Sequence, residues 1–114
     1  MERMTDLQSL PWEAVRPGVA SGVFGKALFD AGLKVVLTRV VPEGEFFSHL
    51  DPYGHLLHVL DGEGEATVGD DTLPLRPGIV VRIAAGEAHG YRNTGAADLI
   101  LMTLNIPGFT ELTP

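Results

Sequence analysis

Three of the chain's four histidines fall within ten residues, in the stretch "HLDPYGHLLH" from His49 to His58. An aspartate, Asp51, stands two positions after the first of them. Imidazole nitrogens and carboxylate oxygens are ligands that first-row divalent metals accept in proteins. The stretch therefore raises the hypothesis of a metal site.

Strand geometry separates these side chains into two groups. Residues i and i+2 of a strand share a face, so His49 and Asp51 are expected to point together, and His55 can join them after the "PYG" turn. His58 lies an odd number of positions from His55 and is expected to face the other way. Ligands from one strand cannot surround an ion, so we expect His89, from a separate strand–loop junction, to complete the set.

Short strands must position these side chains. The 14 glycines and 8 prolines punctuate short apolar runs, which is typical of strands joined by tight turns. Residues 34–41, "KVVLTRVV", read as a strand, and "LDGEGE" carries the Asp-Gly signal of a hairpin. We expect about nine or ten strands in an all-β sandwich or barrel. The one helical turn expected lies in "SLPWEAV", with Ser9 as its cap and Pro11 in its first turn.

Length and charge narrow the classes of function. A chain of 114 residues predicts one domain, with a barrel core at about 12–107 and peripheral segments at 1–11 and 108–114. A net charge of −7 argues against nucleic acid or an anionic membrane as partner. The absence of cysteine excludes thiolate ligands and disulfides. The start, "MERMTDLQSLPWE", does not have the pattern of a secretory signal, so we expect a cytoplasmic protein.

Two segments resemble the two motifs of a small single-domain cupin, an RmlC-like jelly roll. In the first, Gly44 is followed by His49, Asp51, His55 and Gly62, where the family usually has Gly, His, His, Glu and Gly. In the second, the family's Gly, Pro-x-Gly, His and Asn correspond to the following residues: Gly78, Ala84, Gly86, His89 and Asn93. The resemblance runs from about residue 12 to 107 and implies a double-stranded β-helix with little or no helix.

The resemblance also implies a metal. The family offers His, His, Glu and His to a divalent ion, so His49, Asp51, His55 and His89 become the expected ligands, with the carboxylate moved from third to second place. One divalent transition metal is expected, with Zn, Mn, Fe, Ni and Co all open. Asp51 is either a ligand or a neighbour that orients a ligand imidazole.

Other residues are candidates for the pocket. Tyr91 shares parity with His89, and Arg39 lies in mid-strand, so both are candidate catalytic or substrate-binding residues; packing and a solvated face are the alternatives. Arg82 and Arg92 are expected on solvated faces. The expected pocket-lining residues are Phe47, Leu57, Tyr91 and Met102, together with Phe46 and Leu104.

Three functions remain open at this point. The first is a metal-dependent enzyme, an isomerase, lyase, cyclase or dioxygenase, acting on an oxygenated small molecule such as a sugar acid or enediol. "PWEAVRPGV" and "HLDPYGH" resemble cupins of pectin degradation that act on unsaturated sugar acids, although these have Gln where His55 stands. The second is a non-catalytic binding or sensor module, and the third is a structural protein with a vestigial site. A homodimer is expected in each case, through Trp12 and residues 22–29.

Overall fold

The computed structural model describes residues 3–112. These residues form a nearly all-β structure with one short 3-10 helix. The elements are η1 (Leu7–Ser9), β1 (Glu13–Ala14), β2 (Ala20–Ala31), β3 (Leu33–His49), β4 (Gly54–Asp61), β5 (Gly64–Val68), β6 (Asp71–Leu75), β7 (Val80–Ile83), β8 (His89–Asn93) and β9 (Leu99–Ile106).

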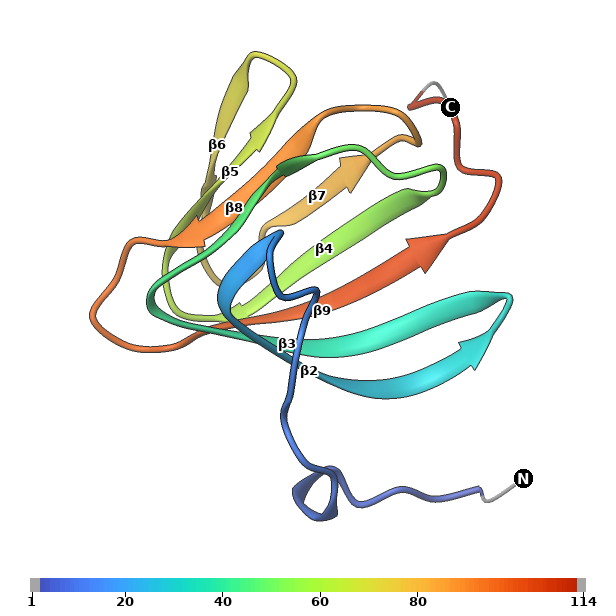
Figure 1. Cartoon of the computed structure of the whole chain (residues 1–114), viewed down its shortest axis with the longest axis vertical. Coiled ribbons are helices and arrows are strands. Elements are labelled where there is room, and N and C mark those ends of the chain that lie inside the picture. Colours follow the sequence, from blue (N-terminus) through green and yellow to red (C-terminus); the bar gives the residue numbers. More distant parts are fainter. Residues whose placement is uncertain (1–2, 113–114) are drawn as a thin grey trace.

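The strands form one curled antiparallel sheet in the order β6-β5-β8-β3-β9-β4-β7, and β2 pairs with both β1 and β3 (Figure 1). Long strand β3 belongs to both halves of the barrel. Residues 34–40 pair with β9, whereas residues 45–49 pair with β8. This arrangement confirms the all-β jelly-roll fold that the sequence predicts.

Strand β3 changes direction at "PEGE". Glu43 adopts a positive φ of 67°, and a side chain on Gly44 would bring its Cβ within 2.7 Å of the Gly22 carbonyl oxygen. The turn therefore requires a residue without a side chain at this crossing. The crossing carries His49 from the β2–β9 side of the barrel to the β8 side.

The core lies between the two halves of the sheet and is purely aliphatic at its centre. Val40, Val59, Leu99 and Leu101 are 0% exposed. This aliphatic layer, the floor of the barrel, excludes water from one end of the barrel. The polar side chains lie at the other end.

The predicted helical turn in "SLPWEAV" is wrong. Helix η1 lies earlier, and the Asp6 side chain accepts a hydrogen bond from the Gln8 backbone at its start. Residues Glu13 and Ala14 are extended because they pair with Gly25 and Phe24 on the edge of β2, which satisfies their backbone groups. Figure 1 shows the segment before them leaving the barrel beside the β2–β3 hairpin.

Within residues 3–112, no helix has the length and apolar character that a membrane span requires.

Candidate metal centre

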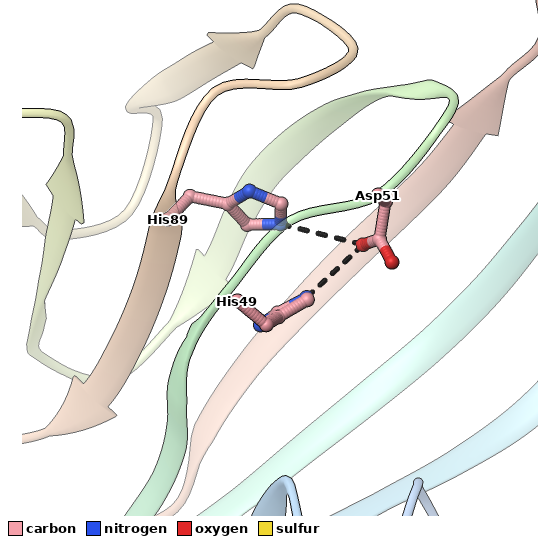
Figure 2. Close-up of side chains that lie close together, drawn as sticks. All are labelled: His49, Asp51 and His89. Carbon is pink, nitrogen blue, oxygen red and sulfur yellow. Dashed lines mark hydrogen bonds and ion pairs between the residues drawn. The ribbon is translucent and has the colours of Figure 1, made fainter.

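One carboxylate oxygen lies among three imidazoles at the mouth of the barrel. Asp51, in the loop between β3 and β4, places Oδ2 at 3.0 Å from Nε2 of His49 and 2.9 Å from Nε2 of His55. Nε2 of His89 lies 3.6 Å from the same oxygen. Figure 2 shows His49 and His89 approaching Asp51 from different strands. The fold thus brings together all four residues that the sequence predicts as ligands.

The far nitrogen of each imidazole is held by a carbonyl group. Nδ1 of His49 donates to the Phe47 backbone oxygen at 2.8 Å, and Nδ1 of His89 donates to the Glu87 backbone oxygen at 2.9 Å. Nδ1 of His55 donates to Oδ1 of Asn105 at 3.0 Å. Because a carbonyl oxygen can only accept, each Nδ1 carries a proton, and the Nε2 atom of each ring is the one that faces Asp51.

The three Nε2 atoms around Oδ2 give the centre its electrostatic character. Neutral imidazoles would place only acceptors around an anionic oxygen, so a positive charge, a proton or a cation, is required between them. His89 is a poor source of that proton. Burial lowers its pKa below the usual 6.5, and this effect outweighs the opposite effect of its hydrogen bond to the Glu87 carbonyl. The donor set suits a cation better than it suits an empty, neutral cluster.

Asp51 stays ionised in this buried position. Burial opposes its charge, but the hydrogen bond from Arg16, the hydrogen bond from His55 and the positive charge of His49 when these rings are protonated, and the positive charge of Arg16 outweigh that effect and lower its pKa below 3.8. Nη1 of Arg16 donates to Oδ1 at 3.0 Å, leaving Oδ2 directed at the imidazoles. The guanidinium also lies 5.8 Å from the centre of the Phe46 ring.

Arg16 reaches Asp51 from an unusual backbone conformation. Its φ is 39°, a left-handed value that non-glycine residues rarely adopt. Its carbonyl accepts hydrogen bonds from the Val19 and Ala20 backbones, which hold the turn in place. A strained residue fixed in this way at the mouth of a polar centre points to a functional constraint.

A cavity of about 320 Å³ opens beside these residues. That volume accommodates one small molecule. Its four candidate ligands come from β3, β4, β8 and one loop, and its other lining residues include Arg16, Lys34, Thr38, Phe46, Tyr53, Leu57, Tyr91, Thr103 and Asn105.

Tyr91 and Leu57 line this cavity as expected. Tyr91 is buried, and burial raises the pKa of its hydroxyl well above 10, so the hydroxyl stays protonated at physiological pH. Its hydroxyl makes no hydrogen bond to any of the described residues and is available to a ligand.

The prediction that Phe47 and Met102 line the cavity is wrong. Phe46 is the lining residue, although it stands three positions before His49, because the β3–β8 register is interrupted between them. That bulge reverses the alternation, and Phe47 is 45% exposed. On β9 the cavity receives Thr103 and Asn105, so alternation turns Met102 and Leu104, both expected in the lining, to the other face.

Arg39 is likewise misplaced by the sequence prediction. Thr38 lines the cavity and Arg39 does not, because they point to opposite faces of β3. The Arg39 guanidinium lies 4.8 Å from the Trp12 ring centre and 5.4 Å from that of Phe24. His58 is also absent from the cavity lining, as alternation predicts.

Sequence reasoning missed Arg16, Lys34 and Asn105. The sequence does contain a sign of Asn105, because it is a polar residue near the end of an otherwise apolar strand. Arg16 carries none, because nothing in "AVRPGV" indicates a contact with a residue 35 positions away.

The model of the cupin domain family matches residues 36–105. No curated protein sequence gives a significant match. Solved structures do: the polyketide cyclase RemF from Streptomyces resistomycificus superposes with a TM-score of 0.83 at 22% identity, over 92% of this chain and 79% of that one. A predicted oxalate decarboxylase from Thermotoga maritima gives 0.82 at 19% identity, over 91% and 98%. KdgF from Halomonas sp. gives 0.78 at 16% identity, over 92% and 94%.

Proposed function

This chain belongs to the cupin domain family, and on that premise we propose that it is a divalent-metal-dependent enzyme acting on an oxygenated small molecule. His49, Asp51, His55 and His89 would hold the ion, and the substrate would occupy the adjoining cavity. The convergence of three Nε2 atoms on the Asp51 carboxylate carries this proposal.

The spacing of three of the four donor atoms is compatible with a coordination shell. A metal–nitrogen distance of about 2.1 Å places neighbouring ligand atoms about 3.0 Å apart in an octahedron and about 3.4 Å apart in a tetrahedron. The contacts of Asp51 Oδ2 with the three Nε2 atoms measure 3.0, 2.9 and 3.6 Å. The ligand atoms of His49, Asp51 and His89 all lie within 4.8 Å of one another, whereas His55 is outside that group, so a four-ligand shell requires the His55 ring to move.

The geometry favours Asp51 as a ligand over Asp51 as an orienting neighbour. An orienting acceptor takes the proton on the ring nitrogen that faces away from the metal. Those Nδ1 protons are already taken by Phe47, Glu87 and Asn105, and Asp51 faces the Nε2 side of every ring.

The chemistry proposed is that of an isomerase, lyase or cyclase. When bound, a divalent ion supplies Lewis acidity toward a carbonyl or enediol oxygen. The protonated Tyr91 hydroxyl would donate a hydrogen bond to the substrate, and the Thr38 and Thr103 hydroxyls, which lie 3.1 Å apart, form a polar patch above the aliphatic floor. A sugar acid has the hydroxyl and carboxylate groups that such a lining recognises.

Elemental analysis of the protein purified without added metal tests this proposal. We expect about one first-row divalent ion per chain, with zinc or manganese favouring Lewis-acid chemistry and iron favouring a dioxygenase. Full metal occupancy without turnover of sugar acids or enediols would favour the binding or sensor module instead. A protein that takes up no divalent metal even on reconstitution would contradict the proposal.

We propose in addition that two copies associate through the outer face of the β2–β3 hairpin. Residues 22–29 lie on this hairpin, Phe29 is 47% exposed, and the Lys26 ammonium lies 4.6 Å from the Trp12 ring centre. Sedimentation equilibrium should give twice the mass of one chain. Phe29→Glu should shift the equilibrium toward single chains, whereas a wild-type mass of one chain at all concentrations would contradict this proposal.

A further inference from the structure

A row of three side chains crosses the mouth of the cavity at right angles to the strands. Lys34 on β3 is the register partner of Asn105 on β9, and Asn105 is the register partner of His55 on β4. All three line the cavity. Register partners on neighbouring strands point to the same face, so the row joins Lys34 to a candidate metal ligand through Asn105.

The two rows of side chains that follow this one toward the floor of the barrel carry no charged residue. Val36, Thr103 and Leu57 form the next row, and Thr38, Leu101 and Val59 the one after it. The cavity therefore runs from an ionic mouth through a hydroxyl-bearing middle to an aliphatic floor. A ligand with a charged group can place that group only at the mouth.

Lys34 is the cation at the mouth that no acid neutralises. Among residues 3–112, Lys34 forms no ion pair, whereas Arg16, the other basic residue of the cavity lining, is bound to Asp51. Two acids lie in the region: Glu13 lines the cavity, and Asp30 is the β2 register partner of Lys34. Neither makes an ion pair with the ammonium.

From this placement we infer that Lys34 is a specificity-determining residue that binds the carboxylate of the substrate. The inference rests on the proposed function and narrows its substrate to a small hydroxy- or keto-carboxylate. Neighbouring strands are about 4.8 Å apart, so the backbones of Lys34 and His55 are separated by roughly 10 Å across the row. A ligand could place its carboxylate at Lys34 and a hydroxyl or carbonyl oxygen at the imidazole centre, with Asn105 between them.

The charge of the whole chain gives this lysine its importance. A net charge of −7 repels anions at long range, so an anionic ligand needs a local cation that is not already paired. Lys34 is one of only two lysines, and the other, Lys26, lies on the outer face with its ammonium on the Leu7 carbonyl and above Trp12. The two lysines therefore make a matched pair for experiment.

The test compares ligands that differ only in the carboxylate. Isothermal titration of the metal-loaded protein would use D-galacturonate against D-galactose, and glycerate against glycerol. The wild-type protein should bind at least one of the acids about tenfold or more tightly than its neutral counterpart, as expected for a charge-assisted hydrogen bond. Lys34→Met should remove this preference while retaining the aliphatic stem, and Lys26→Met should retain it.

Two results would overturn the inference: a wild-type protein without preference for either acid, or a preference that survives in Lys34→Met. Metal content measured on the same samples keeps this inference separate from the proposed function. Lys34→Met should hold as much metal as the wild type. A metal-loaded protein without acid preference would contradict only the inference, and a metal-free protein that still prefers acids through Lys34 would contradict only the metal proposal.

Discussion

Two arginines, one lining the cavity and one outside it, show how differently the same side chain can be used. Arg16 points inward and binds the buried carboxylate of Asp51 at 3.0 Å. Arg39 points outward and lies against the rings of Trp12 and Phe24, with Asp98 as far as 4.0 Å from its Nε. That Nε is buried and has no hydrogen-bond partner among the described residues.

The difference follows from what surrounds each guanidinium. The inner arginine has a charged partner that is itself held by three imidazoles, so it belongs to the network that shapes the candidate centre. The outer arginine has aromatic faces, which attract a cation but impose no direction on its hydrogen bonds. Inner substitutions should therefore change ligand chemistry, and outer substitutions should change only packing.

The largest expected effect comes from the inner cluster. His89→Ala should abolish stoichiometric metal binding, because it removes the ligand candidate that β8 supplies. Elemental analysis after dialysis measures this, with His58→Ala as the control outside the cavity. Equal occupancy in both variants would show that the cluster around Asp51 is not the metal site.

Acidity should weaken the same cluster. As pH falls from about 7 to 5, protons compete with the ion for the imidazole nitrogens, so metal affinity should fall. Titration with a competing chelator at several pH values measures this effect. A flat profile would argue against histidine ligands.

The metal-free protein should also lose stability with acidity. The pKa of His89 is lower in the folded chain, so below pH 6.5 the unfolded chain binds more protons and the free energy of unfolding decreases. The lowered pKa of Asp51 acts in the same direction, but only near and below pH 3.8. Thermal unfolding at pH 7.5 and 5.5 should show a smaller drop for His89→Gln than for the wild type, and Arg39→Met should behave like the wild type.

A smaller effect is expected from Arg16→Met. Without the guanidinium, Oδ1 of Asp51 loses its partner and the carboxylate is less firmly directed at the imidazoles. Metal affinity should fall by about tenfold, as is usual when a group that orients a ligand is removed. An unchanged affinity by chelator competition would show that the imidazoles alone position Asp51.

The smallest effect is expected from Arg39→Met. The change removes the cation above Trp12 and also the buried Nε without a hydrogen-bond partner, and these contributions oppose each other. The free energy of unfolding should change by less than about 1 kcal/mol, with metal affinity unchanged. A loss of metal in this variant would contradict the expectation that substitutions outside the cavity change only packing.

The sequence could predict what depends on spacing. The strands, the hairpins and the four residues around the centre all follow from residue type and motif spacing, and the fold confirms their convergence. Errors arose where the two-residue alternation of a strand crosses an irregularity: Phe46 and Phe47 were both expected in the cavity lining, and the interrupted register between Phe46 and His49 places only Phe46 there. The prediction that Arg39 lies in the cavity was wrong for a related reason. The segment "VVLTRVV" is apolar on both faces of the strand and does not indicate which face is inside.

What depends on long-range contact could not be predicted. Arg16 meets Asp51 only because the N-terminal segment folds back over the mouth, and Lys34 gains its place from the register with Asn105. The single domain, the cytoplasmic location and the absence of nucleic-acid and membrane partners rest on length, charge and composition and stay predictions.

The pairing of β3 with β8 has a consequence for local motion. His49 and His89 are register partners beside the bulge, and Gly90 permits the close approach there, since its Cβ would lie 2.6 Å from the Phe46 carbonyl oxygen. A slip of one residue would turn His89 to the opposite face. An ion shared by these two rings would therefore hold together an irregular part of the sheet. Amide hydrogen exchange in β8 should slow on metal loading, while exchange in the β5–β6 hairpin stays nearly constant.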